Sequence, residues 1–168
     1  GYNAVSCSYN GGTDRVTMRF YSSLFSDGAF ATARSRTLSE AIRIHDQLWA
    51  DGVITSDMSQ REKAYAYYDY ICSHCTYDYQ AVDNSISHSA YSLFFNGTAV
   101  CDGYTAAYNL LLKLEGIDCT TWSTESHIWT VATLGGQTCH IDTTWGSQSP
   151  AVRGSYFGMT EKESLSRF

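Results

Sequence analysis

The chain has 168 residues, 43% of them hydrophobic, which is enough to bury one core and form a single domain. Its formal net charge is −6, and the sequence has no cluster of basic residues. Both features argue against nucleic acid or an anionic membrane as a partner. It has one proline, no low-complexity run and no apolar stretch of membrane-spanning length, so neither a long linker nor membrane insertion is expected.

Two secondary-structure patterns stand in the first third of the chain. Apolar and polar residues alternate over residues 16–20, which predicts a strand. Thr37 and Glu40 form a capping-box pattern ahead of apolar residues at helical spacing. This pattern predicts a helix that begins there and ends at Asp51-Gly52.

A second capping-box pattern, Ser59 with Glu62, opens a segment rich in tyrosine and alanine. It predicts a helix that reaches about Ser73. Residues 76–100 show no sustained period, so we expect loops there with short structured pieces.

Cys101 lies where a loop is expected to become a helix. The N-terminal end of a helix favours a thiolate over a thiol, so the position suits a nucleophilic cysteine. Gly103 leaves room beside the sulfur, whereas a carboxylate on Asp102 opposes ionisation of the thiol. Gly116 is the expected stop of this helix. Its apolar residues at helical spacing are Ala106, Ala107, Leu110, Leu111 and Leu114.

His127 and Asp142 lie on two β-like runs, over residues 127–131 and 140–145, on either side of a hairpin signal at Gly135-Gly136. If Leu134 and Gln137 flank a two-residue turn, His127 and Asp142 fall on the same face as diagonal neighbours. Their Cβ atoms would then be about 5.5–7 Å apart, within reach of an imidazole–carboxylate hydrogen bond. A three-residue loop would place the two side chains on opposite faces.

A nucleophile, a base and a carboxylate that orients the base are the groups that activate a thiol for acyl transfer. Cys101, His127 and Asp142 supply these groups in that order. Cys101 alone would be interpreted as a small buried hydrophobe, the commonest fate of a free cysteine. The accompanying histidine and aspartate favour catalysis.

Three stretches resemble the transglutaminase-like superfamily, which includes transglutaminases, bacterial cysteine peptidases and related amidases. They are residues 97–105, 127–129 and 140–145, and the resemblance as a whole runs from about Ser59 to Phe157. It implies an α+β, papain-like fold in which helices pack on a small antiparallel sheet. The nucleophile then stands at the N-terminus of a central helix.

The resemblance assigns the nucleophile, base and orienting carboxylate to Cys101, His127 and Asp142. Asp102 and Ile128 depart from the residues common in the family at those positions, although neither replaces a reacting group. Residues 37–168 are the expected catalytic core, with residues 1–36 as an N-terminal strand and lead-in segment.

The sequence is also expected to be a piece of a longer protein. A third capping-box pattern, Thr160 with Glu163, begins a few residues before it stops, and no signal peptide opens it.

Residues that line the cleft are harder to predict. The backbone N–H of Cys101 is the expected first oxyanion donor, and Asn96 and Tyr91 are candidates for the second. Trp129 and Trp145 follow the family pattern and are candidates for the cleft wall. Trp129 is favoured because it faces the same side as His127, although aromatic residues in strands more often belong to a core.

The other histidines have simpler interpretations. His45 lies on the apolar stripe of its predicted helix and is expected to be a core residue with its polar atoms paired. His140 shares a face with Asp142 and is an alternative base, but Asp142 on its own strand is badly placed to orient it. His74 and His88 are expected on the exposed surface.

Cysteine usage bears on cofactors and compartment. A zinc site needs about four ligands, and no second Cys-x-x-Cys or histidine pair accompanies Cys72 and Cys75, so neither a metal nor another cofactor is expected. A local disulfide or two plain thiols is the favoured interpretation of that pair. The disulfide state stays open for Cys7, Cys72, Cys75, Cys119 and Cys139.

The favoured function is cysteine-dependent acyl transfer on peptide or side-chain amides through a thioester, with hydrolysis preferred over protein cross-linking. The expected partner is a protein or peptide, cell-wall associated in the case of a secreted bacterial protein. A composition rich in Ser, Thr and Tyr and poor in Lys favours an extracellular or cell-surface location. The alternative is a binding module for peptide or cell-wall material on the same fold, and a redox role of Cys72 and Cys75 ranks third.

Overall fold

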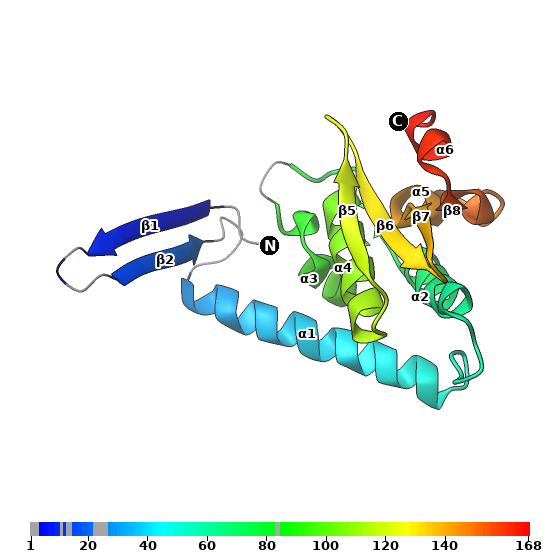
Figure 1. Cartoon of the computed structure of the whole chain (residues 1–168), viewed down its shortest axis with the longest axis horizontal. Helices are drawn as coiled ribbons and strands as arrows, with labels where there is room; N and C mark the ends of the chain where they lie inside the picture. Colours follow the sequence, from blue (N-terminus) through cyan, green and yellow to red (C-terminus); the bar gives the residue numbers. More distant parts are fainter. Residues whose placement is uncertain (1–3, 11, 13–14, 22–26, 83–84) are drawn as a thin grey trace.

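The computed structural model describes residues 4–10, 12, 15–21, 27–82 and 85–168. Strands β1 (Ala4–Asn10) and β2 (Arg15–Tyr21) pair as an antiparallel hairpin, which confirms the strand predicted over residues 16–20. In Figure 1 this hairpin extends beyond the start of helix α1, away from the larger sheet.

Six α-helices occur in the described part of the chain, together with two 3₁₀ turns. The helices are α1 (Asp27–Ala50), α2 (Gln60–His74), α3 (Ala90–Asn96), α4 (Cys101–Leu114), α5 (Thr143–Gln148) and α6 (Glu161–Leu165). The 3₁₀ turns are η1 (Ile86–His88) and η2 (Arg153–Tyr156). No helix of the described residues combines the length and the apolar character needed to cross a membrane.

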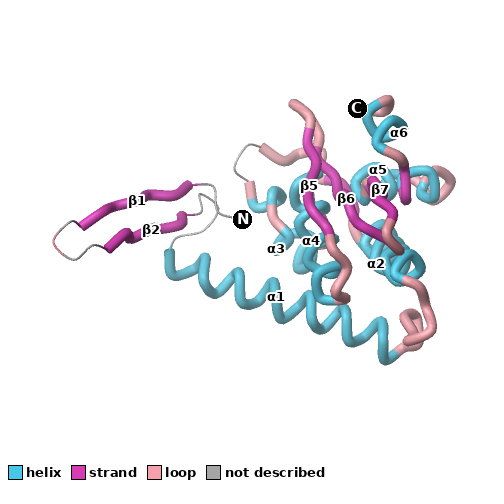
Figure 2. The backbone as a smooth tube through the Cα atoms, viewed as in Figure 1, coloured by secondary structure: helices cyan, strands magenta, loops and turns pink. Residues whose placement is uncertain are grey.

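The main sheet has four antiparallel strands in the order β5-β6-β7-β8. They are β5 (Cys119–Ser123), β6 (Ile128–Leu134), β7 (Gln137–Ile141) and β8 (Phe157–Met159). A short parallel pair, β3 (Thr76–Tyr77) with β4 (Thr98–Ala99), precedes α4. Figure 2 shows α4 lying along the sheet behind β5 and β6, with α1 across the end of this layer. The arrangement is the predicted α+β fold.

Helices α2 and α4 form the centre of the core. Tyr67 and Tyr68 of α2 and Tyr104 and Tyr108 of α4 are fully buried. Burial of one large apolar side chain contributes about 1.5–3 kcal/mol, so these positions carry much of the stability. Helix α4, which begins at Cys101, is therefore anchored along most of its length.

The predicted helix starts are confirmed at α2, α4 and α6, but at α1 only the predicted end at Asp51-Gly52 is confirmed. At α2 the backbone N–H of Ser59 donates to the Glu62 carboxylate (2.8 Å), and that of Glu62 donates back to the Ser59 hydroxyl (3.3 Å). At α1 the predicted start is wrong, because the helix begins at Asp27 and runs through Thr37. The Thr37 hydroxyl there donates to the carbonyl of Ala33 at 2.8 Å, as hydroxyls do inside a helix.

The β6–β7 hairpin has the predicted register. Leu134 faces Gln137 and Thr130 faces Ile141, so the turn has two residues. Gly135 and Gly136 have φ values of 60° and 82°, a conformation that glycine adopts without steric cost. This turn fixes which face of the hairpin carries His127.

Candidate active site

Cys101 is the first residue of α4, as predicted. The strand pair β3–β4 and the backbone bond from Val100 N–H to the carbonyl of Ser87 (3.0 Å) hold the chain just ahead of it. Cys101 is partly exposed and lines a cavity of about 450 Å³ together with His127 and Trp145. The thiol therefore combines the positive end of a helix with access from solvent.

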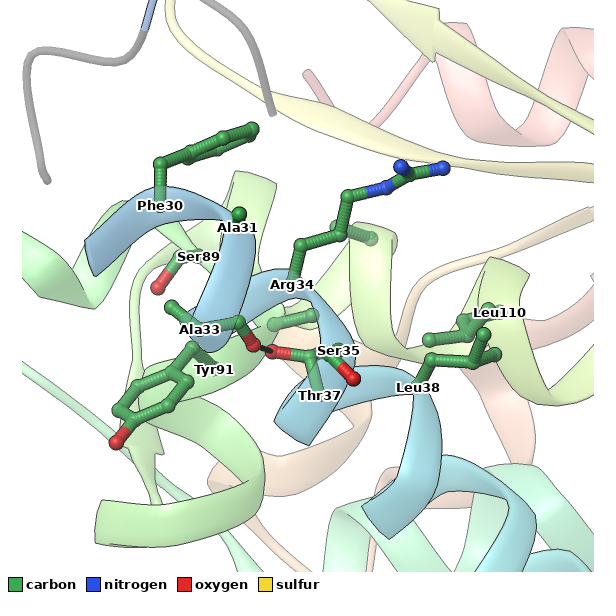
Figure 3. A pocket seen from close by; sticks show the side chains of 12 residues that line it. Phe30, Ala31, Ala33, Arg34, Ser35, Thr37, Leu38, Ser89, Tyr91 and Leu110 are labelled. Atoms are coloured by element: carbon green, nitrogen blue, oxygen red, sulfur yellow. Dashed lines mark hydrogen bonds between the residues drawn. The ribbon is translucent and has the colours of Figure 1, made fainter. Parts of the chain in front are cut away.

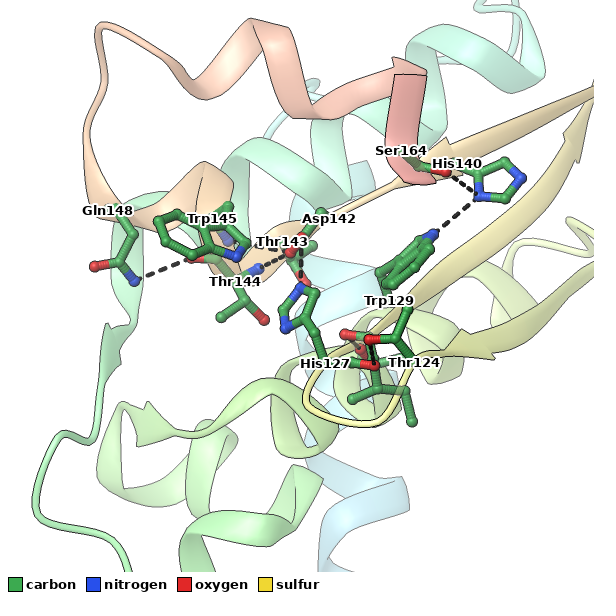
Figure 4. Close-up of polar contacts among 12 residues, drawn as sticks. Thr124, His127, Trp129, His140, Asp142, Thr143, Thr144, Trp145, Gln148 and Ser164 are labelled. Carbon is green, nitrogen blue, oxygen red and sulfur yellow. Dashed lines mark hydrogen bonds and ion pairs between the residues drawn. The ribbon is translucent and has the colours of Figure 1, made fainter. Parts of the chain in front are cut away.

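Asp142 lies directly behind His127. His127 Nε2 is 2.6 Å from Asp142 Oδ2, and the carboxylate is fully buried (Figure 4). The other oxygen, Oδ1, accepts the backbone N–H groups of Thr144 (2.9 Å) and Trp145 (3.1 Å). Asp142 is thus the N-cap of α5, which means that the β-like run predicted over residues 140–145 is wrong beyond Ile141.

Cys101 and His127 line the same cavity, and the thiol acts on the imidazole electrostatically. Because Asp142 occupies Nε2, Nδ1 is the ring nitrogen that remains for the thiol. Burial lowers the pKa of His127, but the hydrogen bond with Asp142 and the charges of Asp142 and Cys101 outweigh burial and raise that pKa to about 9. At neutral pH the ring is therefore an imidazolium, the partner that stabilises a thiolate.

Trp129 supports the His127 ring from inside the protein. It is 1% exposed, and its ring stacks on that of His127 with centroids 5.7 Å apart. Its indole N–H donates to Nδ1 of His140 (2.9 Å), to which the Ser164 hydroxyl also lies close (3.0 Å). Burial lowers the pKa of His140, so the ring stays a neutral acceptor. His140 thus holds Trp129 and does not line the cavity with Cys101.

The cavity walls differ from those predicted. Trp145 is 45% exposed and lines the cavity, whereas Trp129, the favoured candidate, is buried behind His127. Phe168 contacts both rings, with its centroid 4.4 Å from that of His127 and 5.0 Å from that of Trp129. The complete lining is Tyr77, Tyr79, Cys101, Ser126, His127, Thr144, Trp145, Gln148, Arg167 and Phe168.

Asn96 and Tyr91, the candidates for the second oxyanion donor, lie elsewhere. The Asn96 amide donates to the Ser92 hydroxyl within α3 (3.1 Å). Tyr91 lines a different cavity of about 620 Å³, walled by α1, α3 and α4 (Figure 3). The sequence analysis missed the hydroxyl-bearing side chains of this cavity, among them Tyr77, which pairs with Ala99 in β4 and lines the cavity with Cys101. Burial raises the pKa of Tyr77, and the charge of Cys101 adds to this effect.

Hydrogen bonds between side chains and backbone join α4 to the neighbouring strands β6 and β5. The Thr105 hydroxyl of α4 donates to the carbonyl of Ile128 (3.1 Å). The Thr130 hydroxyl of β6 donates to the Asn109 side-chain oxygen (2.7 Å), and the Asn109 amide donates to the Thr121 hydroxyl (3.1 Å). These bonds fix how far α4 can slide along the sheet.

Five cysteines are free thiols: Cys72, Cys75, Cys101, Cys119 and Cys139. Cys72 and Cys75 are buried, and burial raises the pKa of each thiol to about 12, which disfavours the reactive thiolate. Among the described residues no group of three or more His, Cys, Asp and Glu side chains is arranged to hold a metal ion.

Two of the remaining histidines have partners that the sequence did not indicate. His45 is only partly buried and lies between Asp46 (2.9 Å) and Glu115 (3.4 Å), so it is not a simple core residue. His88 faces Asp102 at 2.8 Å, and His74 is exposed as expected.

The chain belongs to the transglutaminase-like superfamily. The model of that family matches residues 47–142, more than half of the 168 residues, and the match ends at Asp142. No curated protein matches the chain in sequence.

Two solved structures align with the chain. The crystal structure of a TGase aligns with the whole chain at 17% identity and a TM-score of 0.56, and the chain spans 49% of that protein's length. A candidate cysteine protease from Cytophaga hutchinsonii aligns with 62% of the chain at 15% identity and a TM-score of 0.46, over 37% of its own length. The first likeness supports the transglutaminase-like fold.

Proposed function

We propose that this protein is a cysteine-dependent acyltransferase that acts on peptide or side-chain amides, with water as the usual acceptor. The observation that carries this proposal is the buried His127–Asp142 pair, with His127 and Cys101 at the wall of one open cavity. Membership of the transglutaminase-like superfamily supports the same chemistry.

In the first half-reaction the Cys101 thiolate attacks the amide carbonyl carbon while His127 holds the thiol proton. The carbon–sulfur bond forms, and the π electrons of the carbonyl move to its oxygen. When the tetrahedral intermediate collapses, the carbon–nitrogen bond breaks and the nitrogen takes the proton from His127. An amine leaves, and a thioester on Cys101 remains.

In the second half-reaction water attacks the thioester and gives a proton to His127. The carbon–sulfur bond breaks, an acid leaves, and the proton returns to the sulfur. An amine in place of water would give a new amide by the same steps. Asp142 stabilises the imidazolium in both halves and keeps Nδ1 directed at the sulfur.

The negative oxygen of the intermediate needs donors. We assign the backbone N–H of Cys101 as one and the Tyr77 hydroxyl as the other, because Tyr77 lines the cavity beside Cys101. Tyr77→Phe should lower the rate of amide cleavage by roughly 100- to 1,000-fold. Alkylation of Cys101, which forms no oxyanion, should keep its wild-type rate.

The first test measures alkylation of every cysteine by iodoacetamide at about pH 6, where an ordinary thiol is well under 1% ionised. Mass spectrometry reports the rate at each position. We expect preferential labelling of Cys101, abolished in His127→Ala and retained in the surface variant His74→Ala. Labelling of Cys101 no faster than that of its neighbours would contradict the proposal and favour a binding module.

The second test identifies the acceptor. Glutamine-containing peptides are incubated with and without a primary amine, and ammonia, free acid and amine adducts are quantified. Free acid as the main product supports hydrolysis. Amine adducts in excess over free acid would assign the enzyme to cross-linking instead.

A further inference from the structure

Asp102 presents a problem for the proposed nucleophile. It follows Cys101 directly on the first turn of α4, and a carboxylate at that position opposes formation of a thiolate. Its side chain is 40% exposed, so water screens the charge only in part. A residue that offsets this charge would therefore favour the reactive form of Cys101.

His88 is placed to do so. Its Nδ1 lies 2.8 Å from Asp102 Oδ2, and the other carboxylate oxygen accepts the backbone N–H of Gly103 at 2.9 Å. Both oxygens of the carboxylate are engaged, so its orientation beside Cys101 is fixed.

The position of His88 is built by backbone contacts to the nucleophile helix. Ser87 accepts the N–H of Val100 at 3.0 Å, one residue before Cys101. A methyl group on Gly103 would lie 2.7 Å from the carbonyl oxygen of Ser87 and 3.0 Å from that of Ser89, so η1 packs directly on α4 at this glycine. Gly103 is therefore needed for this packing, and the room beside the sulfur that the sequence suggested is taken by η1.

Few other charges face this pair. Of the elements that pack on η1, α3 and β4 carry no acidic or basic residue. Helix α4 contributes Asp102 and Cys101. Asp78, from the preceding loop, accepts the Ser87 hydroxyl at 2.5 Å. His88 is thus the basic side chain that the described structure places against Asp102.

We propose that His88 is a positioning residue that neutralises Asp102 and thereby keeps Cys101 in its reactive, ionised form. This inference rests on the proposed function, because it needs Cys101 to be the nucleophile. In its protonated form His88 pairs with Asp102, and the sulfur is next to a neutral pair. Without that proton, or without the ring, a negative charge stands beside the sulfur.

The test is a double-mutant cycle read by the rate of Cys101 alkylation at about pH 6, where most histidine side chains in water carry a proton. The variants are His88→Gln, Asp102→Asn and both together, with His74→Gln as a matched histidine control. His88→Gln should slow alkylation about three- to fivefold, the effect of one partly screened charge a few ångströms from the sulfur. Asp102→Asn should not slow it, the double variant should match Asp102→Asn, and His74→Gln should match the wild type.

A pH series from about 5 to 9 adds a second readout, because the thiol ionises without help at high pH and the difference between wild type and His88→Gln should shrink there. Recovery of the alkylation rate in the double variant distinguishes an effect of charge from an effect on folding. If His88→Gln had disrupted the start of α4, removing the Asp102 charge would not restore the rate. A wild-type rate in His88→Gln, or a double variant as slow as His88→Gln, would overturn the inference. If Cys101 of the wild-type protein shows no preferential labelling, the proposed function itself fails.

Discussion

Replacing Asp142 by asparagine would separate two tasks that one buried carboxylate performs. Oδ2 faces His127 Nε2 at 2.6 Å, while Oδ1 caps α5 through the N–H groups of Thr144 and Trp145. Asparagine has only one acceptor oxygen. If that oxygen keeps the cap, its NH₂ group faces His127 and can no longer accept from the ring.

The size of the effect follows from the lost bond. A hydrogen bond to a charged group contributes about 1.5–3 kcal/mol, and each 1.4 kcal/mol is a factor of ten in population. The imidazolium–thiolate form should therefore fall about 10- to 100-fold in Asp142→Asn, and Cys101 alkylation at about pH 6 should fall with it. Asp142→Ala also removes the cap of α5 and should lose about 1 kcal/mol more in the free energy of unfolding.

The assay combines the alkylation rate of Cys101 over pH 5–9 with urea unfolding of the wild type and both variants. At high pH, where the thiol ionises without help, the alkylation rate of Cys101 should be nearly equal in the three proteins. A folded Asp142→Asn protein with the wild-type rate at about pH 6 would refute the role of Asp142 in holding an imidazolium.

Three further measurements test other parts of the structure. Trp145→Ala should raise KM and leave the free energy of unfolding within about 0.5 kcal/mol, whereas buried Trp129→Ala should cost about 3–5 kcal/mol in urea unfolding. Gly146→Ala should lower the free energy of unfolding by about 1–3 kcal/mol, because its methyl group would overlap the Tyr68 hydroxyl; Gly154→Ala, with open space around it, is the control. The folded-state pKa of His127, about 9, exceeds the unfolded value of about 6.5, so its stabilisation is complete below about pH 6.5 and is lost as pH rises through 9. That loss should be on the order of 3 kcal/mol in urea unfolding and should disappear in His127→Gln.

The sequence predicted the parts of the site that depend on local rules. A two-glycine turn sets the parity of its hairpin, so the shared face of His127 and Asp142 follows from Gly135 and Gly136. The start of α4 at Cys101 follows from helical spacing in the same way. Both predictions needed only residues that are close together in the chain.

The errors arose where a local pattern had two interpretations. Thr37 and Glu40 match a capping box, but the alanine-rich stretch ahead of them favours helix, so α1 continues through that pattern. Thr143 and Thr144 suit a strand by composition. The signal that was missed is Asp142 itself, because an aspartate followed by two threonines is also a good start for a helix.

The cleft walls could not have been predicted from such patterns. Tyr77, Trp145 and Phe168 reach one cavity from three distant segments, and their proximity depends on how α2, α5 and α6 pack. The pairing of His88 with Asp102 has the same origin, since η1 docks on α4 through the backbone. Tertiary contacts of this kind leave no period in the sequence.

The polar bonds between α4 and β6 align the helix that begins at Cys101 with the strand that follows His127. Thr105, Asn109 and Thr130 set the alignment of helix and strand from below the surface, and none of them lines the cavity. Of the residues that do line it, Phe168 packs on the rings of His127 and Trp129, whereas the Tyr79 hydroxyl donates to the Gln148 side chain. Changes around Tyr79 should therefore reshape the cavity without altering how α4 is aligned with β6, whereas changes at Phe168 should also disturb the His127 ring.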